Sequence, residues 1–73
     1  MMDFQLKGDF IELDNLLKAT GLVASGAEAK QSVQAGSMKV NGEVESRVRR
    51  KLRAGDVVER GEQKVSIVGT PGA

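Results

Sequence analysis

The sequence predicts a small α+β domain: an N-terminal strand, two short helices and then a small antiparallel β-sheet of hairpins. Apolar residues alternate with polar ones near the N-terminus, recur three and four positions apart between residues 13 and 35, and alternate again from Met38 onward. That order of elements is typical of the α+β class. With 73 residues, the chain is expected to form a single domain with a thin core over residues 1–73.

The first strand is expected at residues 3–7, where apolar and polar side chains alternate in DFQLK. The first helix is expected over residues 11–20, because leucines recur there at helical spacing. Asp9 followed by Glu12 predicts a capping box at its start, and Gly21 predicts its end.

The second helix is expected over residues 26–35. Ser25 with Glu28 three positions later is the pattern of a capping box, in which each residue satisfies a backbone N–H near the other. Gly36 predicts the end of this helix.

The rest of the chain predicts two hairpins. Asn41-Gly42 favours a type I′ turn, which needs positive φ at both positions. Gly61-Glu62 is expected to close the second hairpin, and residues 69–73 are expected to be a tail. Three apolar residues of the second hairpin are expected to face the core: Val58, Val65 and Ile67.

The composition excludes several classes of function. The chain has no Cys and no His, so it lacks disulfides, thiolate metal sites, the commonest metal ligand and the commonest general base. We therefore expect a non-enzymatic protein with no cofactor and no metal. No apolar run approaches the roughly 20 residues of a membrane span, so no membrane partner is expected. The lack of cysteine fits the reducing cytoplasm, and nothing in the sequence indicates an oligomer, so a cytoplasmic monomer is expected.

Positive charge gathers in one segment. Residues 39–53 hold six of the eleven Lys and Arg residues but only two acids, Glu43 and Glu45, which gives the segment a charge of +4. Four of the six are Arg, whose planar fork suits phosphate. The pattern favours nucleic acid as a partner. Alternatively, the charges are a solvated edge that protects a strand from aggregation.

The aromatic residues narrow the kind of partner. Proteins that bind single strands stack bases on exposed aromatic rings. This chain has only Phe4 and Phe10, both outside the basic segment, and both are expected in the core. We therefore expect recognition of phosphate spacing and shape, as on structured RNA, rather than base stacking.

The order of residues along the chain resembles a known family, the S-four RNA-binding domain, named for the fourth small-subunit ribosomal protein. The pattern is Leu13-Asp14-x-Leu16-Leu17, Ser25, Ala29, Val33, Gly36, Val40-Asn41-Gly42 and Ala54-Gly55-Asp56-Val57-Val58. It covers residues 12–59, and the extra N-terminal strand is most similar to the bacterial YbcJ family of stand-alone domains. The resemblance implies an αL motif, in which two helices and a hairpin form an L-shaped surface for folded RNA.

The resemblance also implies RNA-binding residues by position. They are Lys30, Gln31 and Gln34 in the second helix, Lys39 and Asn41 in the hairpin, and Arg47, Arg49, Arg50 and Lys51 after it. Two positions differ from the family, since Glu12 and Gly26 stand where Arg is common. The basic surface is therefore expected to shift toward residues 39–53.

These observations give one leading hypothesis and one alternative. The leading hypothesis is a small RNA-binding protein that recognises structured RNA, with ribosomal and transfer RNA as candidates, through phosphate contacts. The alternative is a protein-interaction module that docks its basic face on an acidic or ribosome-associated partner.

Overall fold

The computed structural model describes residues 2–69 and confirms the α+β class and the predicted order of elements. The last four positions of the predicted tail, 70–73, lie outside the described residues. The helices are α1 (Leu13–Ala19) and α2 (Gly26–Gln34). The strands are β1 (Met2–Gln5), β2 (Ile11–Glu12), β3 (Met38–Val40), β4 (Glu43–Val44), β5 (Lys51–Leu52), β6 (Val57–Arg60) and β7 (Gln63–Val68).

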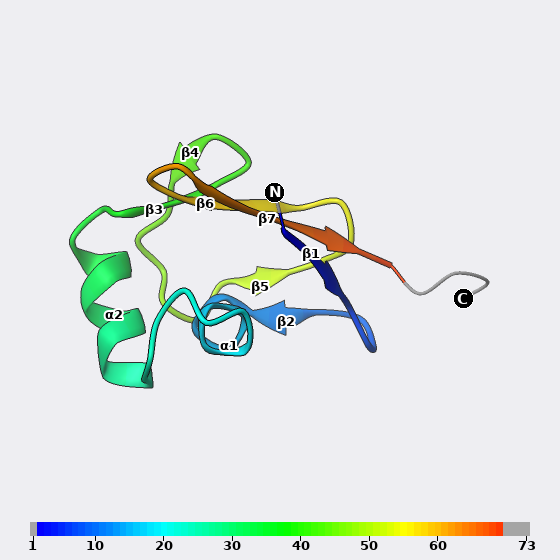
Figure 1. The fold of residues 1–73 in the computed structure, drawn as a ribbon, viewed down its shortest axis with the longest axis horizontal. Coiled ribbons are helices and arrows are strands. Elements are labelled where there is room, and N and C mark those ends of the chain that lie inside the picture. The colour runs from blue at the N-terminus through cyan, green and yellow to red at the C-terminus, as the bar shows by residue number, and fades with distance from the viewer. Residues whose placement is uncertain (1, 70–73) are drawn as a thin grey trace.

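Five strands form the main sheet in the order β1-β7-β6-β3-β4 (Figure 1). The neighbours from β7 to β4 are antiparallel, as the hairpin pattern predicts. The N-terminal strand β1 joins them in parallel beside β7, with Met2 opposite Val65 and Gln5 opposite Val68. The sheet is therefore mixed. The N-terminal strand β1 forms one edge, and the last strand, β7, lies next to it.

A second, two-stranded ladder joins β2 to β5, with Ile11 opposite Leu52 and Glu12 opposite Lys51. The ladder corrects the predicted start of the first helix, because residues 11 and 12 are extended and α1 begins only at Leu13.

The predicted capping box of Asp9 and Glu12 is also wrong. Glu12 is the N-cap residue, and its side chain makes no capping hydrogen bond. The first N–H groups of α1 are satisfied differently, since Leu13 N donates to Arg50 O at 2.8 Å and Asp14 N donates to Val48 O at 3.1 Å. Carbonyls from a distant loop thus replace the local cap.

The start of α2 follows its local signal. Glu28 N donates to Ser25 Oγ at 3.2 Å, and Ala24 N donates to a Glu28 carboxylate oxygen at 3.3 Å. The carboxylate thus reaches the residue before the N-cap. The predicted capping pair of Ser25 and Glu28 is confirmed in this form.

The tight turn between β3 and β4 is also confirmed. Asn41 has φ of 54° and Gly42 has φ of 86°, as a type I′ turn requires. Asn41 is the only non-glycine residue with positive φ within residues 2–69. Asparagine accepts this conformation more readily than most residues, so the sequence and the turn agree.

The helices and the β2–β5 ladder lie on one side of the main sheet, and the core fills the space between them (Figure 1). The fully buried side chains include Leu13, Leu16 and Leu17 of α1, Val33 of α2, Met38 and Val40 of β3, Leu52 of β5, and the predicted Val58, Val65 and Ile67. Burying each such side chain contributes about 1.5–3 kcal/mol. Within residues 2–69, none of the helices has the length and apolar character needed to cross a membrane.

The two phenylalanines differ in burial. Phe4 is partly buried and packs against the core, but 41% of Phe10 is exposed, so the prediction of a core position is wrong for Phe10. Phe10 lies just before β2, outside the paired strands, whereas Ile11 pairs with Leu52 and packs against the core.

Candidate nucleic-acid interface

An open hollow of about 550 Å³ is lined by Arg47, Arg49, Arg50 and Lys51, and we call it the basic hollow. The first three residues belong to the loop between β4 and β5, and Lys51 begins β5. The structure therefore brings four of the nine predicted site residues together.

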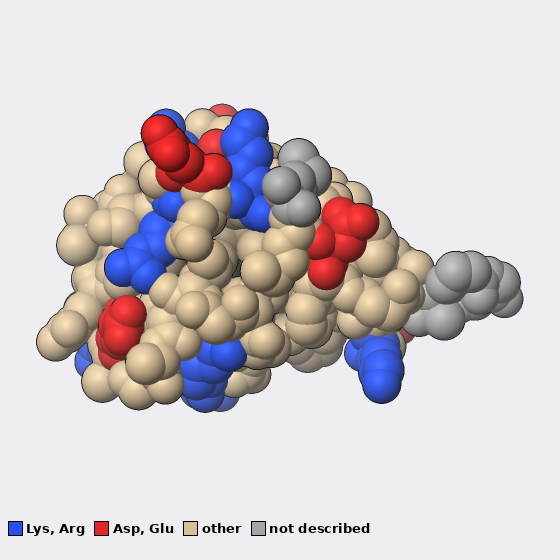
Figure 2. All heavy atoms as spheres, in the orientation of Figure 1, with Lys and Arg blue, Asp and Glu red and all other residues tan. Residues whose placement is uncertain are grey.

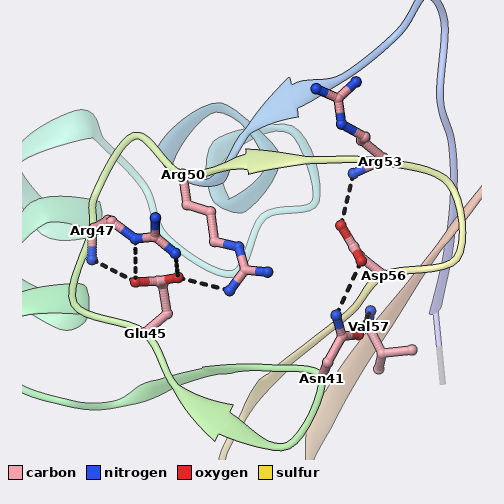
Figure 3. A network of polar contacts seen from close by, with 7 residues as sticks. All are labelled: Asn41, Glu45, Arg47, Arg50, Arg53, Asp56 and Val57. Carbon is pink, nitrogen blue, oxygen red and sulfur yellow. Dashed lines mark hydrogen bonds and ion pairs between the residues drawn. The ribbon is translucent and has the colours of Figure 1, made fainter.

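One buried carboxylate binds two of the arginines that line the basic hollow (Figure 3). Glu45, whose side chain is only 7% exposed, accepts three hydrogen bonds from Arg47, through the backbone N at 2.9 Å, Nε at 3.1 Å and Nη2 at 3.0 Å. It accepts a fourth from Arg50 Nη1 at 2.8 Å. The two-point contact holds the Arg47 guanidinium in a fixed direction, and Arg50 is held by its single charged hydrogen bond.

These hydrogen bonds change the pKa of the carboxyl group. The side-chain hydrogen bond from Arg47 and the further donors outweigh the effect of burial and lower the pKa of Glu45 from 4.5 to about 2. The same carboxylate raises the pKa of the Arg47 guanidinium. Both groups are therefore charged across the physiological range.

The third arginine has a different partner. Arg49 Nε lies 3.1 Å from a Glu12 carboxylate oxygen, and the two side chains are 77% and 25% exposed. The four cations of the basic hollow and the two carboxylates that contact them carry a net charge of +2, and one of these carboxylates, Glu12, lies outside the basic segment of the sequence.

The basic hollow is built on the core rather than on a loose loop. The loop carbonyls of Val48 and Arg50 accept hydrogen bonds from the first turn of α1, and the Val48 side chain packs against the core. This backbone anchoring limits the motion of the residues between them.

A second polar cluster holds the β3–β4 hairpin against β6 (Figure 3). Asn41 Nδ2 donates to Asp56 Oδ1 at 3.0 Å, and Val57 N donates to Asn41 Oδ1 at 2.9 Å. Arg53 N donates to Asp56 Oδ2 at 2.8 Å. Burial of the Asp56 carboxyl group acts to raise its pKa, but the hydrogen bonds from Arg53 N and Asn41 Nδ2 outweigh burial. The pKa of Asp56 is therefore below its ordinary value. The amide of Asn41 therefore has a structural role in the protein without RNA.

The other predicted residues lie apart from the basic hollow. Lys39 is exposed on β3 with Glu59 opposite on β6, and Asn41 lies at the turn. The α2 residues are exposed: Lys30, Gln31 and Gln34. On the face drawn in Figure 2, Lys and Arg side chains alternate with Asp and Glu, so that face has mixed charge.

Sequence reasoning missed two residues of this region, Glu45 and Phe10. Glu45 was counted only as an acid that reduces the charge, yet it lies two and five positions before the arginines that it binds. Phe10 is exposed with the Lys51 ammonium 4.8 Å from its ring centroid. Within residues 2–69, no group of three or more acidic side chains is placed to hold a metal ion.

Comparison with known proteins agrees with the resemblance read from the sequence. The family model of the S4 domain matches residues 4–68. YbcJ of Escherichia coli (strain K12) is 42% identical over 69 residues, which are 93% of this chain and 99% of YbcJ, and YbcJ of Shigella flexneri gives the same values.

The solution structure of YbcJ from E. coli is described as revealing an αL motif involved in RNA binding. It matches this fold with a TM-score of 0.72 and 42% identity, over 93% of this chain and 87% of that chain. The S-four and YbcJ resemblance is thereby confirmed, and with it the αL arrangement. This chain belongs to the S4 domain family.

Proposed function

We propose that this protein binds structured RNA, without catalysing a reaction, through phosphate contacts from the basic hollow. The observation that carries the proposal is the convergence of Arg47, Arg49, Arg50 and Lys51 on one open hollow. The αL motif that YbcJ shares, described there as involved in RNA binding, supports the same partner.

The geometry suits phosphate because two arginines are exposed and one of them is fixed. The side chains of Arg47 and Arg49 are 71% and 77% exposed, and the buried Glu45 carboxylate holds Arg47 at one edge. A guanidinium carries five N–H donors, so the opposite edge of Arg47 retains donors for phosphate oxygens. Fixing this group beforehand reduces the entropy lost on binding.

The proposal extends to the kind of RNA and to the wider surface. No aromatic side chain lines the basic hollow, so it would respond to phosphate spacing on folded RNA. Ribosomal and transfer RNA are candidates, with the cytoplasm as the expected location and a monomer as the binding species. The exposed α2 and hairpin residues would extend the contact: Lys30, Gln31, Gln34, Lys39 and Asn41.

The experiment measures affinity for a labelled RNA duplex across a range of salt concentrations. If about four phosphates are neutralised, log K should fall against log salt with a slope of roughly −3 to −4. The double variant Arg47→Gln and Arg49→Gln should lose at least about tenfold in affinity at low salt, with a slope shallower by about 2 units.

The matched control is Lys18→Gln with Lys64→Gln, which removes the same charge from exposed positions outside the basic hollow. Equal losses in both double variants would mean that only overall charge matters. If the wild-type protein binds no RNA at low salt, the proposal fails. Docking of an acidic partner protein on this surface would then be the better account.

A further inference from the structure

An exposed aromatic ring lies at the edge of a second hollow, which we call the apolar hollow. It has a volume of about 400 Å³ and is lined by Phe4, Gln5, Leu6, Lys7, Phe10 and Ile11. Phe10 is one of three large hydrophobic residues exposed within residues 2–69 and the only aromatic one. Such exposure next to a shaped apolar hollow is the usual mark of a contact surface.

The β2–β5 ladder places the apolar hollow next to the basic hollow. Ile11 pairs with Leu52 and Glu12 pairs with Lys51, so the chain just before β2 lies beside the residues that form the basic hollow. Lys51 belongs to both regions, because it lines the basic hollow and its Nζ lies 4.8 Å from the centroid of the Phe10 ring.

We propose that Phe10 and the apolar hollow receive an unpaired nucleobase of the RNA whose phosphates contact the basic hollow. This inference rests on the proposed function and adds a second feature to the ligand. It also revises the expectation that the protein does not stack bases, which rested on two points: both phenylalanines lie outside the basic segment, and both were expected in the core.

Charge complementarity selects a nucleotide over other occupants. A nucleotide brings an apolar π face and a negative phosphate a short distance apart. The site offers an aromatic ring with the Lys51 ammonium group over one face, so a base would stack on the other face, and Lys7 lines the same hollow. The Arg53 guanidinium adds a third positive charge, donating to the carbonyl of Asp9, the residue before Phe10, at 3.5 Å. A purely apolar partner would gain nothing from these cations and would have to desolvate them.

The consequence is a preference among structured RNAs. A fully paired duplex keeps its bases stacked inside and can use only the basic hollow. An RNA with an unpaired nucleotide beside the helix can use both hollows, so it should bind more tightly, since each stacked base adds to affinity.

The test uses two RNA probes: a blunt-ended duplex, and the same duplex with one bulged adenosine. Wild-type protein should prefer the bulged duplex. Phe10→Leu should weaken binding to the bulged duplex by roughly 5- to 100-fold, the scale on which loss of a stacking aromatic acts, and leave the paired duplex unchanged. Phe10→Trp should retain the preference, because it keeps an aromatic face.

Two controls test whether a loss of RNA affinity comes from lost stacking, rather than from misfolding or from the loss of any exposed apolar side chain. Amide spectra of each Phe10 variant should match those of the wild type, because the side chain is 41% exposed. Val44→Ala changes another exposed apolar residue, on β4, and should preserve the preference for the bulge. Nuclear Overhauser contacts between the Phe10 ring protons and the bulged adenine should appear in the wild-type complex.

Two results would overturn the inference, and they differ in what they say of the proposed function. Equal affinity of wild-type protein for the two duplexes, unchanged by Phe10→Leu, would refute stacking while leaving the phosphate contacts intact. No binding to either duplex at low salt would refute the phosphate contacts, and the stacking site with them.

Discussion

Glu45 and Glu12 each hold an arginine of the basic hollow, but in different surroundings. Glu45 is buried and accepts four hydrogen bonds from two arginines. Glu12 is partly exposed and contacts one arginine, Arg49, whose side chain is 77% exposed. The two ion pairs therefore differ in their effect. The Glu45 pair holds two arginines of the basic hollow in position, whereas the Glu12 pair mainly reduces the positive charge there.

Burial accounts for this difference. Removing one partner of a buried pair leaves an uncompensated group away from water, whereas an exposed pair exchanges its partner for water at little cost. Glu45 should therefore control the stability and shape of the loop. Glu12 should mainly affect how strongly Arg49 attracts a phosphate.

The largest effect is expected from Glu45→Gln. The variant should lose about 2 kcal/mol of stability, below the usual range for a fully buried pair because Arg47 is largely exposed. Chemical denaturation followed by circular dichroism measures the loss. Glu43→Gln, on the neighbouring exposed strand residue, is the matched control and should change stability by less than about 0.5 kcal/mol. Equal denaturant midpoints for Glu45→Gln and Glu43→Gln would show that Glu45 does not organise the loop.

A smaller effect is expected from acid. The pKa of Glu45 is depressed from 4.5 to about 2, so its contribution is complete above pH 4.5 and is lost as the pH falls toward 2. The pKa of Asp56 is also lowered, so it adds to the loss in the same acid range. The difference in unfolding free energy between wild type and Glu45→Gln isolates Glu45. It should shrink between pH 4.5 and 2, and a difference that stays constant would contradict the assigned pKa.

The smallest effect is expected from Glu12→Gln. Stability should change by no more than about 0.5 kcal/mol, as for other exposed pairs. Affinity for the RNA duplex at low salt should rise by roughly twofold, because a negative charge beside the phosphates is removed. If Glu12→Gln binds the RNA duplex more weakly than the wild type, the contrast between the two glutamates is wrong. That result would mean that Glu12 orients Arg49 as Glu45 orients Arg47.

Two local signals in the sequence predicted the local structure correctly, although a third, the capping box of Asp9 and Glu12, did not form. The Ser25–Glu28 pair starts α2, and Asn41-Gly42 makes the turn of the first hairpin, because each depends on residues within a few positions. The αL arrangement followed from the resemblance. The gathering of Arg47 to Lys51 in one hollow also agrees with their closeness in the chain.

Features that depend on distant residues were not predicted. The β2–β5 ladder has two residues on each side, too few to show a periodicity, and it moved the start of α1. The burial of Glu45 depends on arginines that fold back over it. Phe10 is exposed at a position just before the β2–β5 ladder. None of these is visible in a hydrophobic pattern read one segment at a time.

The parallel pairing of β1 with β7 also affects how the chain can fold during synthesis. Gln5 Nε2 donates to Gly69 O, a contact that spans 64 positions, and β7 is the only strand beside β1 within residues 2–69. During synthesis β1 leaves the ribosome early and β7 leaves it late. The backbone of β1 therefore stays unpaired at a stage when the helices and the Asn41-Gly42 hairpin can already form. Closing so long a loop costs entropy that local contacts do not. The strand β1 can therefore pair only after β7 has been synthesised.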